Sequence, residues 1–216
     1  MYFDISSIPK YFPYFLPAAW MTLKVSVLGI ALGSGLGLAT AFLRISHNPF
    51  LRLPARCYIY LIRGTPLLLQ LLFIYFGLRG LAGFNALTSA VLALGIHNGA
   101  YIAEIFRGAI VSIAPGQMEA ARSLGMSYPR AMIRIILPQA LKRAIPALGN
   151  QFIIALKDSS LASTITINEL LLKSQQLASS NFMMMEMLFI AAIFYLVYTG
   201  IFSWFFAYIE SRLNVS

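Results

Sequence analysis

The feature that most constrains this chain is a series of apolar runs long enough to cross a lipid bilayer. A helix needs roughly 20 apolar residues to cross about 30 Å of hydrocarbon, because each residue advances the axis by about 1.5 Å. We expect five transmembrane helices, at about Pro17–Leu43, Cys57–Leu78, Ala86–Ile113, Ala144–Leu156 and Met184–Tyr208. The fourth is short and ends in the polar run Lys157–Ser160. The sequence therefore predicts an all-α, polytopic membrane protein.

The composition agrees with a lipid environment. Of the 216 residues, 59% are hydrophobic and 11% are charged, which is more apolar surface than one water-soluble core can bury. The net charge of +9 does not indicate nucleic acid binding, because the basic residues are spread between apolar runs. Cys57 is the single cysteine, and His47 and His97 lie far apart. No disulfide framework or metal site is therefore predicted.

The basic residues of the connecting loops predict an orientation. Cytoplasmic loops of membrane proteins carry an excess of Lys and Arg. The loops after the first and third helices hold Arg44, Arg52, Arg56, Arg122, Arg130, Arg134, Lys142 and Arg143. The opposite side holds only Lys10, Arg79 and Lys173. We expect the N-terminus outside and the C-terminus in the cytoplasm.

A row of small residues marks the first helix. Gly29, Gly33, Gly37 and Ala41 recur every four residues, so they form one ridge along which another helix can approach closely. The alternative is that glycines are simply frequent in membrane helices. The ridge predicts a packed helical bundle.

The long loop after the third helix predicts a helical hairpin outside the bilayer. Pro115 and Gly116 end the membrane helix, Gln117–Leu124 consists of good helix formers, and Gly125 provides a turn. Tyr128–Ile136 is expected to form a second short helix before Pro138.

Fixed positions in this loop carry a resemblance. The motif consists of Glu119-Ala120-Ala121, then Gly125 after three intervening residues, and then Ile135 and Leu137-Pro138, and it resembles the EAA loop of ATP-binding-cassette (ABC) import permeases. The resemblance implies that residues 115–140 form a coupling segment that docks on an ATPase subunit. Glu119, Ala120, Ala121 and Gly125 would make or shape that contact. The alternative is an amphipathic helix lying on anionic lipid.

The chain has no GxxxxGK[ST] phosphate-binding loop. We therefore expect ATP and its magnesium ion on a partner ATPase, no cofactor on this chain, and no enzymatic activity of its own.

Further stretches resemble the polar-amino-acid permeases of this family, which serve histidine, glutamine, arginine or cystine. They are Ile62–Gln70, Asn98–Arg107, Pro115–Gln117 and Leu156–Leu161, and the last is most similar to the cystine branch. The resemblance implies one permease domain, residues 1–216, in the bacterial inner membrane. A second permease, two ATPase subunits and an extracytoplasmic binding protein would complete the importer. The alternative is a secondary transporter or channel without an ATPase.

The second segment holds candidate pathway residues around a predicted kink. Gly64 loosens the helix and Pro66 removes a backbone donor, so the chain should bend near Arg63 and Thr65. Arg63, Thr65 and Gln70 are candidate solute-pathway residues. Arg63 alternatively extends to the membrane interface.

The third helix contributes two further candidates and an ion pair. Asn98 and Tyr101 lie one turn apart and are expected to face one cavity; the alternative for each is an interhelical hydrogen bond. Glu104 and Arg107 are three residues apart and are expected to pair.

The end of the fourth segment is the predicted solute site. Lys157 and Asp158 lie about 22 Å along this helix from Arg143, so their charges should face protein or water. The hydroxyl-rich sequence that follows suggests an interrupted helix lining a cavity. Asp158 would bind an ammonium group, and Ser159 or Ser160 a carboxylate. The alternative is that Lys157 and Asp158 only cap the helix.

Overall fold

The computed structural model describes residues 4–78 and 83–213, and Arg79 lies outside them. Within these residues the chain forms helices and no strand, which confirms the all-α prediction. In chain order the elements are η1 Ile5–Ser7, α1 Ile8–Tyr11, η2 Phe12–Phe15, α2 Leu16–Ile45, α3 Pro49–Arg63, α4 Leu67–Leu72, η3 Phe73–Gly77, α6 Ala86–Val111, α7 Pro115–Ser123, α8 Tyr128–Ala131, η4 Met132–Ile136, α9 Leu137–Asp158, η5 Ser159–Ile165, α10 Leu170–Asn181 and α11 Met184–Arg212.

Three described helical stretches are long and apolar enough to cross a membrane. They are the run Ile5–Ile45, which ends with α2, and the helices α6 and α11. Each coincides with a segment expected from the sequence. Helix α6 is mostly enclosed by other helices, whereas α11 is largely exposed on the surface.

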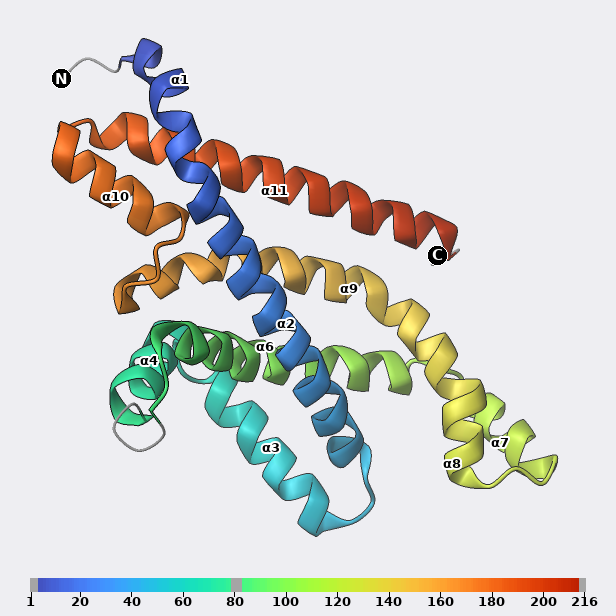
Figure 1. The fold of residues 1–216 in the computed structure, drawn as a ribbon. Coiled ribbons are helices and arrows are strands. Elements are labelled where there is room, and N and C mark those ends of the chain that lie inside the picture. Colours follow the sequence, from blue (N-terminus) through green and yellow to red (C-terminus); the bar gives the residue numbers. More distant parts are fainter. Residues whose placement is uncertain (1–3, 79–82, 214–216) are drawn as a thin grey trace.

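Helix α2 crosses α6 at close range (Figure 1). The small-residue ridge forms the contact: Gly29, Gly33, Gly37 and Ala41 are all buried. A Cβ atom on Gly37 would lie 2.7 Å from Cγ2 of Ile102, and one on Gly33 would lie 3.0 Å from the carbonyl oxygen of Gly95. Real Cβ atoms essentially never approach as closely as 2.7 Å and rarely as closely as 3.0 Å, so the packing prediction is confirmed.

The expected second segment, Cys57–Leu78, is two helices instead of one. Helix α3 begins earlier, at Pro49, and ends at Arg63, and the helix Leu67–Gly77 leaves it at an angle of 105°. The bend lies at Gly64-Thr65-Pro66, where a Cβ atom on Gly64 would lie 2.8 Å from the carbonyl oxygen of Tyr60. The predicted kink is confirmed. At 105° it divides the segment into two separate helices.

The hairpin after α6 differs from the prediction in its second arm. Helix α7 and the turn at Gly125 are present, but the second helix does not stop before Pro138: α8, η4 and α9 follow without a break. In the π-helical turn η4 the N–H of Leu137 bonds to the carbonyl of Met132. This wider bonding lets the helix pass through Pro138, which has no N–H to donate.

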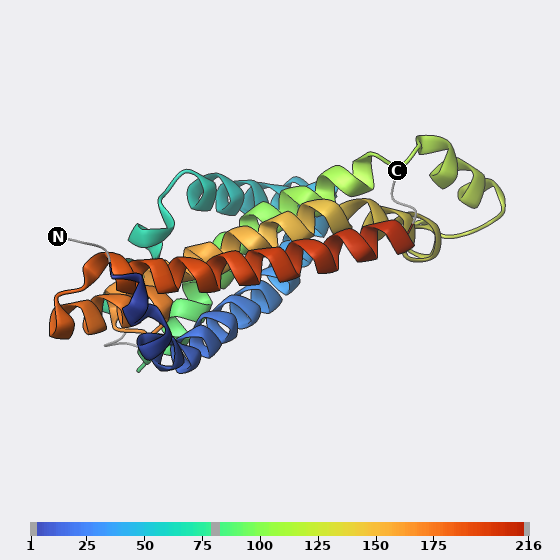
Figure 2. The same ribbon diagram turned by 90° about the horizontal axis from the view of Figure 1, so that it is seen from above.

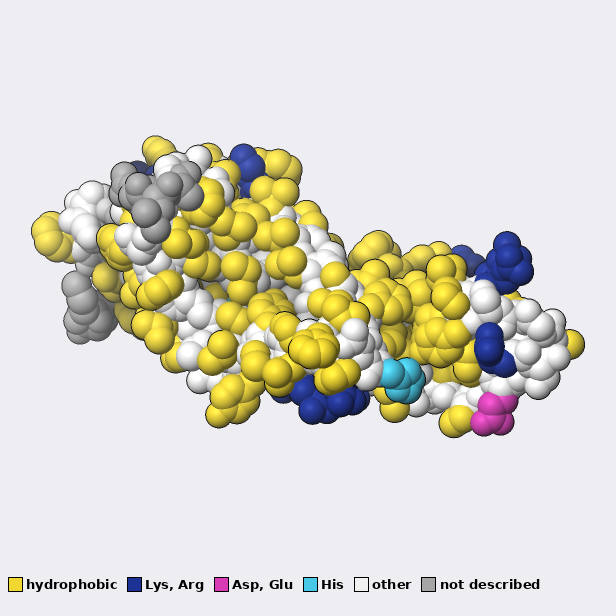
Figure 3. Space-filling view, turned by 90° about the horizontal axis from the view of Figure 1, so that it is seen from below, with side chains coloured by type: hydrophobic (Ala, Val, Ile, Leu, Met, Phe, Trp, Pro, Cys, Tyr) yellow, Lys and Arg dark blue, Asp and Glu magenta, His cyan; other side chains and the backbone are white. Residues whose placement is uncertain are grey.

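The molecule is elongated, and the hairpin projects from one end. Figure 2 shows α7 beyond the bundle at the end where α11 finishes, with α1 at the opposite end. Apolar side chains cover most of the face in Figure 3, and Lys and Arg gather near its middle and on the projecting lobe. The fold therefore separates an apolar body from a polar, projecting end.

Candidate functional site

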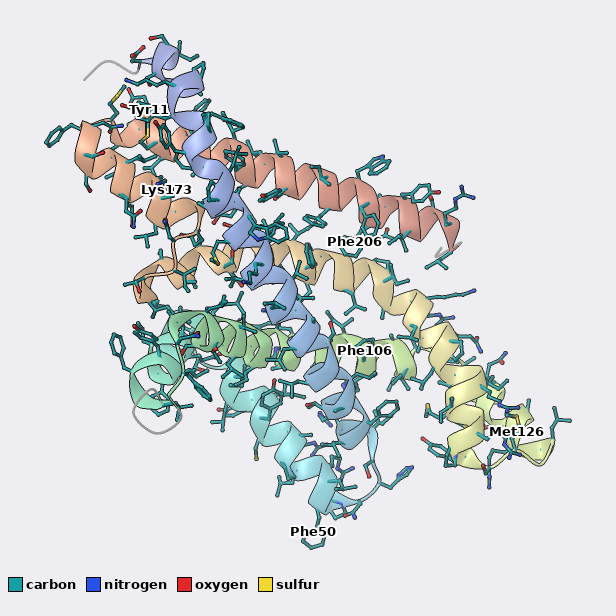
Figure 4. The ribbon with its side chains drawn as sticks, viewed as in Figure 1. Tyr11, Phe50, Phe106, Met126, Lys173 and Phe206 are labelled. Carbon is teal, nitrogen blue, oxygen red and sulfur yellow. The ribbon has the colours of Figure 1, made fainter. Side chains whose placement is uncertain are left out.

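Part of the EAA motif lies exposed on the surface of the hairpin. Glu119 and Ala120 are exposed, whereas Ala121 is only 5% exposed and packs within the hairpin. Gly125 has a φ angle of +80°, in the left-handed region that favours glycine. The Arg122 guanidinium donates a hydrogen bond of 2.9 Å to the Met126 carbonyl and closes the turn. Figure 4 shows Met126 at this turn, away from the bundle.

One exposed residue of the hairpin was missed by the sequence reasoning. Leu124 is 85% exposed at the point where α7 ends. Its position directly before Gly125 was the available signal, because the helix ends at the glycine turn and Leu124 is left at the tip of the hairpin.

The end of α9 lines a cavity with α11. Lys157 and Ser160 face a cavity of about 610 Å³ together with Tyr195 and Thr199. Helix α9 ends at Asp158 and continues as the 3₁₀ helix η5, and Thr166 then takes a left-handed conformation. The interrupted helix that the sequence predicted is therefore present.

Asp158 and Ser159 differ in their surroundings. The Ser159 side chain is buried, and its hydroxyl donates a hydrogen bond of 2.7 Å to the Leu156 carbonyl. Asp158 is half-buried, and among the described residues its carboxylate has no hydrogen-bond or ion-pair partner. Ser160 is therefore available to a solute in the cavity, Asp158 is not among the residues that line it, and Ser159 stabilises the helix end.

Asn98 and Tyr101 do not share a cavity, contrary to the prediction. Asn98 is fully buried and accepts a hydrogen bond of 2.7 Å from the Gln151 amide of α9. It therefore makes the interhelical bond that was the alternative. Tyr101 lines a different cavity, of about 500 Å³, beside Arg44, Arg56, Arg63 and Glu104. The two positions lie only about 60° apart around α6, but Asn98 is bonded to Gln151 of α9, whereas Tyr101 lies against Arg63 of α3.

Charged side chains surround this second cavity. The Arg63 guanidinium lies 5.0 Å from the centre of the Tyr101 ring, within the range of a cation–π contact. The predicted pairing of Glu104 with Arg107 is confirmed at 2.8 Å. Arg44 also approaches Glu104, at 3.7 Å, a contact between α2 and α6 that local spacing does not reveal.

Gln70 holds the two sides of the α3–α4 bend together. Its amide nitrogen donates to the Ile62 carbonyl at 2.8 Å and to the Thr65 hydroxyl at 2.9 Å. Its amide oxygen lies 3.1 Å from Nδ1 of His97 on α6. Thr65 and Gln70 also line an apolar cavity of about 390 Å³. Gln70 thus stabilises the bend and fixes it against α6.

Known proteins resemble the chain over its whole length. It is 41% identical to the glutamine transport system permease protein GlnP of Escherichia coli strain K12, with 100% of both chains covered. It is 37% identical to the nopaline transport system permease protein NocM of Agrobacterium fabrum, with 93% of this chain and 88% of that one covered.

Two solved structures share the fold. The crystal structure of an amino acid ABC transporter with histidines matches with a TM-score of 0.90 at 43% identity, covering 98% of this chain and 100% of that one. An inward-facing structure of the MetNI methionine ABC transporter matches with a TM-score of 0.81 at 18% identity, over 92% of this chain and 95% of that one, and supports the fold alone.

A family model described as "Binding-protein-dependent transport system inner membrane component" matches residues 11–215. With the full-length relatives, this match shows that the chain belongs to that family, the inner-membrane permeases of ABC importers.

Proposed function

We propose that this chain carries a polar amino acid inward across the bacterial inner membrane. It would do so as one of two permease subunits assembled with two ATPase subunits. Residues 1–216 form its single permease domain. ATP and magnesium are bound by the ATPase subunits, and an extracytoplasmic binding protein delivers the solute. Family membership contradicts the alternative of a secondary transporter or channel that works without an ATPase.

One observation supports this proposal above the others. The helix that starts in the exposed hairpin, at Tyr128, runs unbroken to Asp158, next to the cavity lined by Lys157 and Ser160. A movement imposed on the hairpin therefore reaches the polar end of α9. This is the connection that an ATP-driven permease requires between its coupling segment and its solute path.

The membrane topology is part of the proposal. Helices α2, α6, α9 and α11 and the bent pair α3–α4 would make five spans. The hairpin and the end of α11 lie at the same end of the molecule (Figure 2), so one membrane face holds both. The basic loops support a cytoplasmic position for that face and an extracytoplasmic N-terminus.

The solute site is proposed at the end of α9. Asp158 binds the ammonium group of the amino acid, because its half-buried carboxylate is otherwise unpaired among the described residues. Lys157 and Ser160, which line the adjacent cavity, bind the carboxylate. Thr65 and Gln70 contribute to the path from the α3–α4 bend. Asn98 and Ser159 do not contact the solute in this proposal; their hydrogen bonds stabilise the helices that form the site.

The identity of the amino acid is open to a direct test. The run Lys157–Leu161 favours cystine, and the relative GlnP is a glutamine permease. We expect reconstitution with the neighbouring ATPase and binding protein to show ATP hydrolysis stimulated by one of cystine, glutamine, arginine, histidine or glutamate. If no amino acid stimulates hydrolysis, the proposed substrate class is wrong.

Two substitutions test the assigned roles in the same system. Asp158→Asn should reduce uptake at least tenfold, the effect of one lost charge-assisted bond of about 1.5 kcal/mol or more, while assembly with the ATPase is preserved. Normal uptake would reject Asp158 as a solute ligand. Glu119→Ala should leave the permease folded but lower transport per ATP hydrolysed, and an unchanged ratio would contradict its role in coupling.

A further inference from the structure

The cavity between α2, α3 and α6 has an excess of positive charge that the amino-acid site does not explain. Three arginines and one glutamate line it: Arg44, Arg56, Arg63 and Glu104. Glu104 is already neutralised, because it pairs with Arg107 at 2.8 Å and approaches Arg44 at 3.7 Å. Arg56 and Arg63 have no ion-pair partner among the described residues.

The two unpaired arginines lie on one face of α3. They are seven residues apart, two helical turns, so both guanidinium groups reach the same cavity. Arg63 is also held in place, because its guanidinium lies 5.0 Å from the centre of the Tyr101 ring. Seen from below, Lys and Arg side chains gather at one edge of the molecule, about midway along its length (Figure 3).

Position along the helix argues against contact with lipid tails. Arg63 lies about 9 Å along α3 from Cys57, where the membrane span is expected to begin, at 1.5 Å per residue. A guanidinium at that depth requires water or a counter-ion, because facing hydrocarbon is costly. The cavity of about 500 Å³ has room for such an anion.

We propose that this cavity is an oxyanion-binding site in which Arg56 and Arg63 bind a carboxylate or phosphate group. Arginine presents paired N–H donors that match both groups. Two sources carry this chemistry: the phosphate headgroup of an anionic lipid in the cytoplasmic leaflet, and the carboxylate of an amino acid leaving the solute path. The second source rests on the proposed function, whereas the first does not.

The test compares variants of the full-length permease in nanodiscs. In Arg56→Gln/Arg63→Gln both guanidinium groups are lost. Arg52→Gln is the matched control, because Arg52 lies on the same helix and outside the cavity lining. Retention of phosphatidylglycerol is measured by native mass spectrometry, and binding of radiolabelled glutamine is measured in nanodiscs of phosphatidylcholine alone.

Each result decides the proposal. About a tenfold loss of phosphatidylglycerol retention in the double variant, and not in Arg52→Gln, supports a lipid headgroup. The same loss for glutamine, with lipid retention unchanged, supports the amino-acid carboxylate. Equal behaviour of the double variant and the control, or a wild-type protein that retains neither probe, overturns the proposal.

A second variant covers the case in which the double variant does not fold. Arg56→Lys/Arg63→Lys keeps both charges and removes the paired donors, so a loss of about threefold is expected and no loss overturns the proposal. Failure of the proposed function has a different signature: no amino acid would stimulate ATP hydrolysis. Failure of this inference alone would leave that stimulation intact.

Discussion

Gln151 of α9 donates a hydrogen bond of 2.7 Å to the side-chain oxygen of Asn98 on α6, and both side chains are buried. Asn98 in turn donates to the Leu94 carbonyl at 2.8 Å. A buried polar group without a partner is costly, so this pair is satisfied only at one relative position of the two helices. It therefore fixes the register of α9 against α6.

Replacing Asn98 with Leu should destabilise the protein by about 1–3 kcal/mol, because the Gln151 amide would be left buried without an acceptor. Denaturant unfolding in detergent measures the change. The double variant Asn98→Leu/Gln151→Leu should recover part of the loss, since it removes both polar groups. A double variant that is less stable than Asn98→Leu would contradict this interpretation.

Gly37→Ala should be less stable than Gly35→Ala by about 1–3 kcal/mol, the usual cost of overpacking. A Cβ atom on Gly37 would lie 2.7 Å from Ile102, whereas one on Gly35 meets nothing within 4 Å. Both substitutions raise helix propensity equally, so the difference isolates the α2–α6 contact. The measurement is the thermal unfolding midpoint of each variant. Equal midpoints would show that the ridge is not under packing constraint.

Gly125→Ala should lower transport per ATP several-fold, because alanine at a φ of +80° costs about 1–2 kcal/mol and distorts the hairpin turn. Gly116→Ala is the control, since a Cβ atom there meets nothing within 4 Å and its φ is ordinary. Uptake and phosphate release are measured together in proteoliposomes. The same ratio in both variants would show that the turn geometry does not matter for coupling.

Gln70→Leu should loosen the bend between α3 and α4, because it removes the hydrogen bonds to Ile62 and Thr65. Spin labels at the exposed positions Tyr60 and Phe76, with Cys57 replaced, report the distance between the two helices. A broader distance distribution is expected by electron paramagnetic resonance. Gln175→Leu, at an exposed position on α10, is the control and should leave the distribution unchanged.

Features that depend on neighbouring residues could be predicted from the sequence. Glycine spacing predicted the ridge of α2, Gly64 and Pro66 predicted the bend, and residue spacing predicted the Glu104–Arg107 pair. In each case the cause acts within one or two helical turns. The same holds for the end of α9, where the polar run after Leu156 coincides with the change of helix type.

Features that depend on distant partners could not be predicted. Asn98 meets Gln151 53 residues away, so its spacing from Tyr101 gave no indication of the bond. The arginine-lined cavity forms because α3 brings Arg56 and Arg63 beside Arg44 of α2. The helix from α8 to α9 continues through Pro138 because of one π-helical turn, η4. Sequence rules for proline do not predict such a turn.

The continuous helix from the hairpin to the end of α9 acts as a curved lever (Figure 1), with Pro146 inside α9. Over the 22 residues of α9, about 33 Å, a rotation of about 5° at one end displaces the other by about 3 Å. That displacement is as large as a hydrogen bond is long, so it can make or break a contact to a bound solute. Energetic coupling between two sites is reciprocal. Binding of a solute at Asp158 should therefore change the affinity of the ATPase for the hairpin. The factor is the same as that by which ATPase binding changes the affinity for the solute.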